Sequence, residues 1–405
     1  MRIALYGIAG LYNYGCEAIV RGTEIFLHTI WPEADIVYYS KQYESDKRVI
    51  SDINVSVIRQ NRDYTLVERC INKGFRIAEI PYSIGDSSQK QVVNESFDIV
   101  VSIGGDIYTI PKYLLNRKKY PYYNKLVKLG DTVLKTKTKL LIFGASIGPF
   151  GNYQKAINYY ARHLRNVDLI IAREKKTVEY LQGLEVKRNV KLLPDPAFLV
   201  TLEEEYNVNP EYIGINFSPL SFREIYGNVS DEYIESLVAY IIKLHTSLNR
   251  KLMLIPHVIS PTSENDNDLL FMEKIVQKIP DTYNSQIIIT NPRSFLEAKR
   301  ELRKCKVVIA ARMHCAINAL SEGVPTLLLS YSEKSKGMTE FVYGDDKWVV
   351  PLDKTMSGVT RKLLELLENE DSLRNYLKKR IKDIRKMYFN NSIYSEMQEV
   401  FDNDR

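Results

Sequence analysis

The sequence predicts an α/β protein made of two doubly wound domains with parallel sheets. Short runs of β-branched and aromatic residues alternate with longer helical patterns in both halves of the chain, and the runs end in small or polar residues. A chain of 405 residues also exceeds the size at which one hydrophobic core keeps growing. Strands that alternate with helices in each half indicate two Rossmann-like domains.

Ten runs carry this strand pattern. In the first half they read RIALYG, ADIVYYS, FDIVVSIGG, KLLIFGAS and VDLIIARE, and in the second half YIGINFS, KLMLIPH, SQIIIT, KVVIAAR and PTLLLSY. The stretch 195–210 leaves the pattern and carries three consecutive acids, so we place the boundary there. We expect an N-terminal domain over 1–200, a C-terminal domain over 211–362, and a charged helical segment over 363–405 that packs back across the domains.

The composition is that of an ordinary globular protein with a mild preference for anionic partners. The net charge is +6, and no zinc-finger, RNA-recognition or basic-helix signature is present, so we expect no nucleic-acid partner. Basic residues cluster between 112 and 139, where Asp131 is the only acid. This cluster is either a solvated helical face or a contact for anionic lipid headgroups or an anionic acceptor.

The four cysteines form no CxxC pair, and the histidines form no HxxxH or HExxH pair, so we expect neither disulfides nor a metal site. The N-terminus is too interrupted by Gly, Tyr and Asn for a signal peptide, and no apolar run is long enough to span a bilayer. We therefore expect a cytoplasmic protein, with peripheral contact at the inner face of the membrane as an open alternative.

The segment 306–334, KVVIAARMHCAINALSEGVPTLLLSYSEK, is the most informative part of the chain. It reads as a β-α-β unit with Arg312 and His314 at the strand-to-helix junction, which is the edge of a sheet where ligands bind. Arg312 supplies a permanent cation, His314 can hold or release a proton near neutral pH, and Lys334 follows the next strand. This arrangement predicts a site for a small, highly charged anion on which proton transfer occurs.

Four further residues are candidates. The glycine-bearing loop after the first strand contains Asn13 and Glu17, but its spacing matches neither a dinucleotide fingerprint nor a P-loop. Glu17 has either a helix-end role or an acceptor-binding role. Arg173 stands at another strand end before a helix, where it is either a surface ion-pair partner or an anion ligand. His257 is a further proton-transfer candidate or a structural histidine.

These segments resemble the polysaccharide pyruvyl transferase family from about residue 1 to 350. The matching motifs are the early loop ending in GLYNYGCEA, then SIGGD, GASIGPF, IARE, DPAF, IGINFSP and ARMHCAINALSEGVPTLLLSYSEK. One departure is Cys16, because the family often has Asp at that position, and this chain has no carboxylate there.

The resemblance implies a fold similar to the GT-B glycosyltransferases and a specific activity. The family transfers a pyruvyl group from phosphoenolpyruvate onto two hydroxyls of a sugar, which gives a pyruvate ketal and phosphate without a further cofactor. By that similarity Arg173, Arg312 and Lys334 bind phosphoenolpyruvate in this chain, and His314 is the catalytic acid. We expect the N-terminal domain to be the acceptor side and the C-terminal domain the phosphoenolpyruvate side, and Asn13 and Glu17 have either an acceptor-binding role or a loop role.

Two other functions remain open from the sequence. A GT-B glycosyltransferase would bind a nucleotide sugar at the same sheet edge, and Glu322 is the obvious carboxylate for its ribose. A catalytically inactive carbohydrate-binding protein of a surface-polymer pathway is the second alternative. The acceptor of a pyruvyl transferase would be a cell-surface polysaccharide, a lipid-linked precursor or a small glycoside.

Overall fold

The computed structural model of the chain describes residues 1–61, 64–85, 87–202, 209–227, 229–330, 334–352 and 356–402. The side chains of residues 88, 89, 334, 335, 356 and 357 are outside this description, and so is the central part of the predicted boundary stretch, 203–208. The chain divides into two compact units. The first comprises residues 1–11, 19–196 and 387–405, and the second comprises 12–18 and 197–386.

The described residues of the first unit form a seven-stranded sheet in the order β3-β2-β1-β4-β5-β6-β7, with every neighbouring pair parallel. Its strands are β1 (Arg2–Tyr6), β2 (Asp35–Ser40), β3 (Ser56–Arg59), β4 (Ile99–Ile103), β5 (Lys139–Ala145), β6 (Leu169–Ala172) and β7 (Val190–Leu192). The central strands are almost continuously apolar because helices cover both faces of a parallel sheet.

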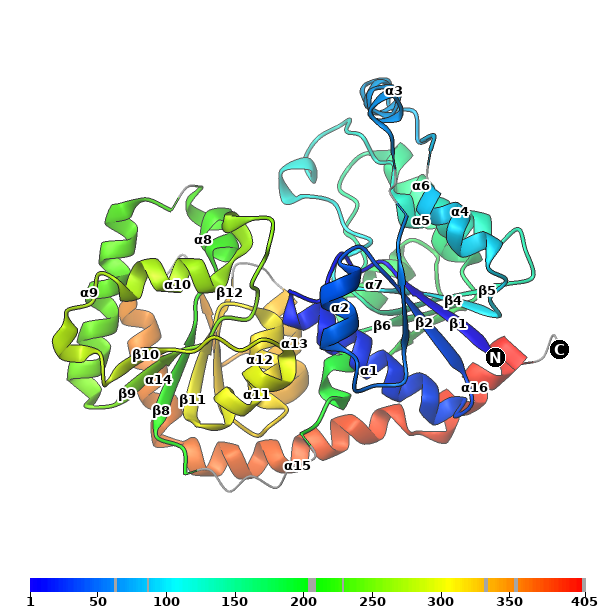
Figure 1. Cartoon of the computed structure of the whole chain (residues 1–405). Helices are drawn as coiled ribbons and strands as arrows, with labels where there is room; N and C mark the ends of the chain where they lie inside the picture. The colour runs from blue at the N-terminus through cyan, green and yellow to red at the C-terminus, as the bar shows by residue number, and fades with distance from the viewer. Residues whose placement is uncertain are drawn as a thin grey trace. The chain divides into compact units, whose positions relative to one another are not determined.

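The helices that accompany this sheet alternate with its strands along the chain (Figure 1). They are α1 (Tyr14–Ile30), α2 (Tyr43–Val49), α3 (Leu66–Ile77), α4 (Ser87–Asn94), α5 (Lys125–Val133), α6 (Gln154–Asn166), α7 (Lys175–Gly183) and α16 (Asn391–Asp402), with the 3-10 turn η1 (Lys112–Leu114). A second 3-10 turn, η2 (Pro196–Leu199), lies where the chain passes into the second unit. The first turn of α1 is grouped with the second unit.

The described residues of the second unit form a six-stranded parallel sheet in the order β10-β9-β8-β11-β12-β13. Its strands are β8 (Tyr212–Asn216), β9 (Lys251–Leu254), β10 (Ile287–Ile289), β11 (Cys305–Ala310), β12 (Thr326–Ser330) and β13 (Val349–Pro351). Its helices are α8 (Pro219–Tyr226), α9 (Asp231–Leu248), α10 (Asp268–Val276), α11 (Phe295–Arg303), α12 (Met313–Leu320), α13 (Lys334–Tyr343), α14 (Met356–Glu368) and α15 (Glu370–Tyr388), with the turns η3 (Glu264–Asp266) and η4 (Asp281–Tyr283).

Both faces of the second sheet carry a hydrophobic core, as a doubly wound fold requires. Val307 and Ile309 of β11 pack into the cluster that contains residues of α9 and α14, whereas Val308 and Ala310 pack into the cluster that contains residues of α11, α12 and α15. Alternate side chains of one strand therefore serve two cores. The predicted fold class is confirmed by this arrangement.

The C-terminal helices pack back on the chain as predicted, and each contact lies within one unit. In the second unit, Arg374 of α15 donates to the carbonyls of Cys305 and Lys306, and Arg385 donates to that of Phe198. In the first unit, the ring of Phe401 on α16 packs edge-on against Trp31. Among the described residues, no helix is long and apolar enough to cross a bilayer.

All ten predicted strands are present, and three further strands were not predicted. The missed strands are β3, β7 and β13, and each lies at an edge of its sheet. An edge strand pairs on one side only and is partly exposed, so it lacks the continuous apolar run of a central strand. In β3 and β7 none of the residues is fully buried.

Candidate active site

The strand-to-helix junction that the sequence predicts around Arg312 and His314 lies at the carboxyl edge of the second sheet. Strand β11 ends at Ala310, Arg312 is the N-cap residue of α12, and His314 lies in the first helical turn. Strands β11 and β12 pair in parallel, and Gly323 takes a positive φ of 73° after α12, which ends the helix as the sequence indicated. The predicted β-α-β unit is confirmed.

The Arg312 guanidinium is held by two carboxylates. Its Nε lies 3.1 Å from each oxygen of Asp268, and its Nη2 lies 2.7 Å from Asp268 Oδ1 and 2.6 Å from Asp266 Oδ1. Burial alone would lower the pKa of Arg312, but the charges of Asp268 and Asp266 outweigh it and raise the pKa above its usual value. The permanent cation that the sequence places at this junction is thus ion-paired, because a buried guanidinium requires a counter-charge.

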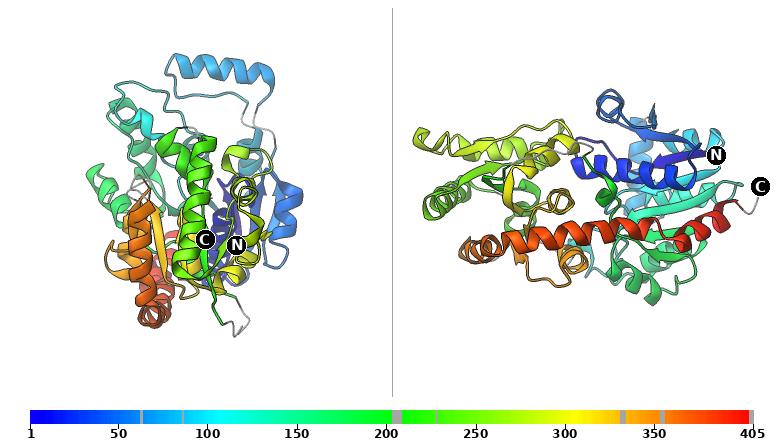
Figure 2. Two further views of the ribbon diagram at one scale, coloured as in Figure 1. Left: turned by 90° about the vertical axis from the view of Figure 1, so that its left-hand side faces the viewer. Right: turned by 90° about the horizontal axis from the view of Figure 1, so that it is seen from below.

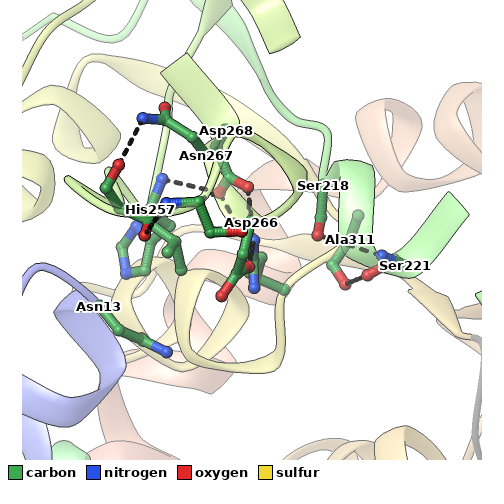
Figure 3. Close-up of polar contacts among 12 residues, drawn as sticks. Asn13, Ser218, Ser221, His257, Asp266, Asn267, Asp268 and Ala311 are labelled. Carbon is green, nitrogen blue, oxygen red and sulfur yellow. Dashed lines mark hydrogen bonds and ion pairs between the residues drawn. The ribbon is translucent and has the colours of Figure 1, made fainter. Parts of the chain in front are cut away.

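Asp268 organises the loop between β9 and α10. Its carboxylate is fully buried, and its Oδ2 accepts hydrogen bonds from the backbone N–H groups of His257 (3.0 Å) and Val258 (3.1 Å). The side-chain amide of Asn216, at the end of β8, also donates to it at 3.3 Å. Figure 3 shows Asp266, at the end of η3, and Asp268, at the start of α10, with His257 close by. One carboxylate therefore ties three strand ends together.

The early loop at residues 12–17 is part of this same site. Asn13 forms an isolated antiparallel bridge with Val258, and the N–H of Tyr14 donates to the carbonyl of His257 at 3.1 Å. The Asn13 side chain accepts from the N–H of Gly15 at 3.0 Å, which starts the turn into α1. Asn13 thus lies beside the loop that bears His257 (Figure 3).

Gly15 and His314 are in close contact. A Cβ atom at position 15 would lie 2.5 Å from both Cγ and Nδ1 of His314. Only a residue without a side chain allows the first turn of α1 to approach the imidazole this closely. The early glycine therefore serves to admit the histidine ring, which is a more specific role than backbone flexibility.

Glu17 and Tyr14 are both buried and both hold the loop before α11. Glu17 Oε2 accepts a hydrogen bond of 2.6 Å from the N–H of Phe295, the first residue of α11. The Tyr14 hydroxyl donates to the carbonyl of Pro292, and burial raises the pKa of Tyr14. Glu17 therefore caps the start of α11 rather than that of its own helix, and its predicted role in acceptor binding stays a prediction.

His257 is a buried imidazole between two aromatic rings. Its ring centroid is 5.6 Å from that of Tyr14 and 5.9 Å from that of Phe295, both in edge-on geometry. Within the described part of the chain, neither ring nitrogen has a hydrogen-bonding partner. Burial first, and then the nearby charges of His314 and Arg312, lower the pKa of His257 well below its usual value. The ring is therefore neutral at physiological pH.

The first unit has its own charged cluster at the carboxyl ends of four neighbouring strands. Arg173, directly after β6, donates to Ser146 after β5 (2.9 Å), to Asp195 after β7 (2.8 Å) and to Asp106 after β4 (3.2 Å). Gly105 admits the guanidinium, because a Cβ there would lie 2.9 Å from its Nη1. Burial lowers the pKa of Arg173, and the carboxylates, led by Asp195, more than offset this. Four of the sequence motifs thus converge on one arginine.

The structure therefore brings some of the predicted residues together. Asn13, Glu17, Arg312 and His314 lie in one cluster of the second unit, and Arg173 lies in the cluster of the first. Lys334 begins α13, but its side chain is outside the described residues. The four acids that partner the arginines were not predicted as site residues, namely Asp106, Asp195, Asp266 and Asp268. The rule that a buried arginine needs a carboxylate could have found them.

Comparison with solved structures defines the class of fold. UDP-GlcNAc 2-epimerase from Neisseria meningitidis bound to UDP-GlcNAc matches with a TM-score of 0.60 and 11% identity over 99% of both chains. A ugt transferase from Siraitia grosvenorii in complex with UDP matches with a TM-score of 0.56 and 10% identity over 99% of both chains. UDP-GlcNAc 2-epimerase from Methanocaldococcus jannaschii matches with a TM-score of 0.53 and 12% identity over 91% of this chain and 92% of that chain. The chain thus has the GT-B fold of these epimerases and glycosyltransferases.

The family follows from a second comparison. The family model described as polysaccharide pyruvyl transferase matches residues 13–333, which is most of the chain and includes Asn13, Arg173, Arg312 and His314. The chain belongs to the polysaccharide pyruvyl transferase family.

Proposed function

We propose that the protein transfers a pyruvyl group from phosphoenolpyruvate onto two hydroxyls of a sugar in a cell-surface polysaccharide or its precursor. The observation that carries this proposal is the family match over 13–333, within which His314 lies in the first turn of α12. The products would be a cyclic pyruvate ketal and inorganic phosphate.

The reaction balances without a cofactor. A proton adds to the terminal CH₂ carbon of phosphoenolpyruvate, so that this carbon becomes a methyl group and its neighbour becomes electrophilic. One sugar hydroxyl attacks that neighbour and loses its proton, and the C–O bond to phosphate breaks. The second hydroxyl then attacks the same carbon, loses its proton and closes the ketal ring. A positioned imidazolium is a suitable acid for the first step or for the leaving phosphate.

His314 is the residue we assign to proton transfer. Its place in the first turn of α12 puts it among backbone N–H groups that favour an anionic ligand. The contact with Gly15 restricts the imidazole on one side. His257 is buried and neutral. It lies close enough to His314 that a positive charge on His314 lowers the pKa of His257.

The two arginines support anion binding through exchange of a carboxylate partner. Each has one deeply buried partner, because the side chains of Asp195 and Asp268 are 4% and 0% exposed. Each also has a more exposed partner, because those of Asp106 and Asp266 are 53% and 32% exposed. We propose that the carboxylate or phosphate of phosphoenolpyruvate replaces the exposed acid, while the buried acid keeps the guanidinium oriented.

The fold favours a second candidate, a glycosyltransferase or epimerase that uses a nucleotide sugar, because two of the structural neighbours named above hold UDP-GlcNAc and UDP. The carboxylate that such a site would use for ribose is already engaged in this chain. The Glu322 side chain is 6% exposed, its Oε1 lies 3.0 Å from Lys299 Nζ, and its Oε2 lies 2.5 Å from Arg303 Nε. These ion pairs argue against Glu322 as a ribose ligand.

Calorimetric titration of the protein with phosphoenolpyruvate and with UDP-GlcNAc would separate the two candidates. Phosphate release from phosphoenolpyruvate should then be measured against a panel of sugar acceptors, with product mass as confirmation. We expect His314→Ala to retain phosphoenolpyruvate binding and to lose phosphate release. His245→Ala, at a half-buried site on α9, is the matched control and should behave as wild type. Normal turnover in the His314 variant would refute the assignment.

A further inference from the structure

Helix α3 presents a row of large apolar side chains to solvent. Leu66, Val67 and Ile77 are 79%, 69% and 76% exposed, and Ile71 is 42% exposed. Figures 1 and 2 show α3 standing apart from the rest of the first unit, joined to it by the chain segments at its two ends. A helix of a globular protein normally turns such residues inward, so an exposed row of them indicates an interaction surface.

A different side of α3 holds it to the protein. Asn72 is buried and exchanges two hydrogen bonds with the backbone of Ile84, at 3.0 Å and 2.9 Å. Thr65 and Glu68 form a capping box at the start of the helix. The polar and capped side is therefore the packing side, and the apolar row is left uncovered by the described residues.

Cations border the apolar row. At about 100° per residue, Leu66, Val67, Ile71 and Ile77 share one arc of the helix, and the exposed Arg69, Lys73 and Arg76 share the neighbouring arc. The acid in α3 is Glu68, whose carboxylate accepts a hydrogen bond from the N–H of Thr65. An apolar arc with a basic border is the pattern of a helix that lies in the plane of a membrane surface.

A second exposed segment of the first unit repeats this chemistry. Tyr113 in η1 is 70% exposed, and the Arg117 guanidinium lies 5.7 Å from its ring. Lys112, Lys118 and Lys119 beside it are exposed as well. The chain segments 79–81 and 121–123 line a common hollow, so the base of α3 adjoins the end of this basic stretch. Tyrosine and lysine are residues that favour the headgroup region of a bilayer.

We propose that α3, together with the segment 112–119, docks the protein onto a membrane surface that contains anionic phospholipid. The apolar arc of α3 enters the boundary between headgroups and acyl chains, and the flanking cations pair with lipid phosphates. A second copy of the chain is the less favourable occupant, because a symmetric contact would bring like charges of the two copies together. This inference concerns where the protein works and does not depend on the proposed reaction.

Flotation of the full-length chain with vesicles tests the proposal. We expect binding to vesicles of equal parts phosphatidylcholine and phosphatidylglycerol, weak binding to phosphatidylcholine alone, and weaker binding as salt increases. Each cation removed should lower partitioning about five-fold. The charge variant carries Arg69→Gln, Lys73→Gln and Arg76→Gln. Its partitioning onto the anionic vesicles should therefore be about a hundred-fold weaker than that of wild type. Loss of binding at every salt concentration is expected for Leu66→Ser combined with Ile77→Ser.

Matched controls lie on the C-terminal helices. The charge control removes three exposed lysines of α15 through Lys379→Gln, Lys382→Gln and Lys386→Gln. The apolar control is Leu364→Ser on α14, a side chain that is 42% exposed. Both controls should bind vesicles as wild type does. Equal losses in the controls, or no vesicle binding by wild type, would overturn the proposal.

A fluorescent probe on α3 tests insertion without changing the apolar or basic residues, so the result does not depend on whether the variants fold. Cys70 lies on the same arc as Leu66 and is exposed, so it can carry an environment-sensitive fluorophore in a Cys16→Ser background. Anionic vesicles should shift its emission to the blue. Unchanged emission contradicts insertion. A concentration-dependent dimer that Leu66→Ser dissociates would instead assign the apolar arc to a second copy.

Discussion

The contact between Gly15 and His314 allows a quantitative test of the candidate site by a single methyl group. In Gly15→Ala the new Cβ would lie 2.5 Å from His314 Cγ and Nδ1 and 2.8 Å from His314 Cβ. Carbon atoms in contact normally lie about 3.5–4.0 Å apart, so the imidazole must retreat by about 1 Å. A displacement of that size can reduce turnover about a hundred-fold, which corresponds to about 2.7 kcal/mol in the activation barrier.

The expected effect on stability is smaller than the effect on turnover. Crowding costs about 1–3 kcal/mol, and replacing Gly by Ala in a helix recovers about 1 kcal/mol. The φ of Gly15 lies outside the left-handed region, so alanine fits the backbone. Phosphate release from phosphoenolpyruvate measures turnover, and the NMR resonances of the His314 imidazole report its position independently of any reaction.

Gly358→Ala in α14 is the matched control, because a Cβ there meets no atom within 4 Å. It should leave turnover and the His314 resonances unchanged. If Gly15→Ala also has wild-type turnover and unshifted His314 resonances, the imidazole is not held against α1 and the reasoning fails.

Two further predictions concern the neighbours of this contact. Asp268→Ala leaves Arg312 buried beside the half-buried Asp266 and should lower the free energy of unfolding by about 3–5 kcal/mol in urea titrations. Asp266→Asn should tighten phosphoenolpyruvate binding by up to about five-fold in calorimetry. Weaker phosphoenolpyruvate binding in Asp266→Asn would contradict the exchange model. The pKa of His257 is lowered in the folded state, so the unfolded state binds more protons below about pH 6.5, and stability should fall by about 1.4 kcal/mol per pH unit on acidification below that value. His257→Phe should remove this contribution, and an unaltered pH slope in that variant would count against a neutral buried ring.

The order and type of the central elements follow from local sequence pattern. Runs such as LLIF of β5 and VVIA of β11 are buried on both faces, and their apolar continuity is visible without any knowledge of the partners. The edge strand β3 has no such signal, because two half-buried residues lie between two exposed ones and none of the four is fully buried. A strand that pairs on one side only is defined by its place in the sheet. Its four residues therefore carry no hydrophobic pattern from which the strand could be predicted.

The sequence predicted which residues lie at the strand end, but not the side chains that contact them. Arg312 and His314 could be placed at a strand end because both lie within a few residues of β11. The carboxylates that hold Arg312 lie more than 40 positions away in the chain. The cap that Glu17 provides to Phe295 spans 278 positions. Such partners depend on how the chain returns to the same sheet edge, which no local pattern encodes.

The grouping of residues 12–18 with 197–386, and of 387–405 with 1–196, has a consequence for how this chain can be divided. A cut between residues 200 and 211 would leave an N-terminal fragment without α16 and the ring of Phe401, and a C-terminal fragment without Asn13, Tyr14 and Glu17. Each half would then lack part of its own structure, and supplying the missing peptide should restore it. During synthesis, too, the first unit cannot be completed before α16 has left the ribosome.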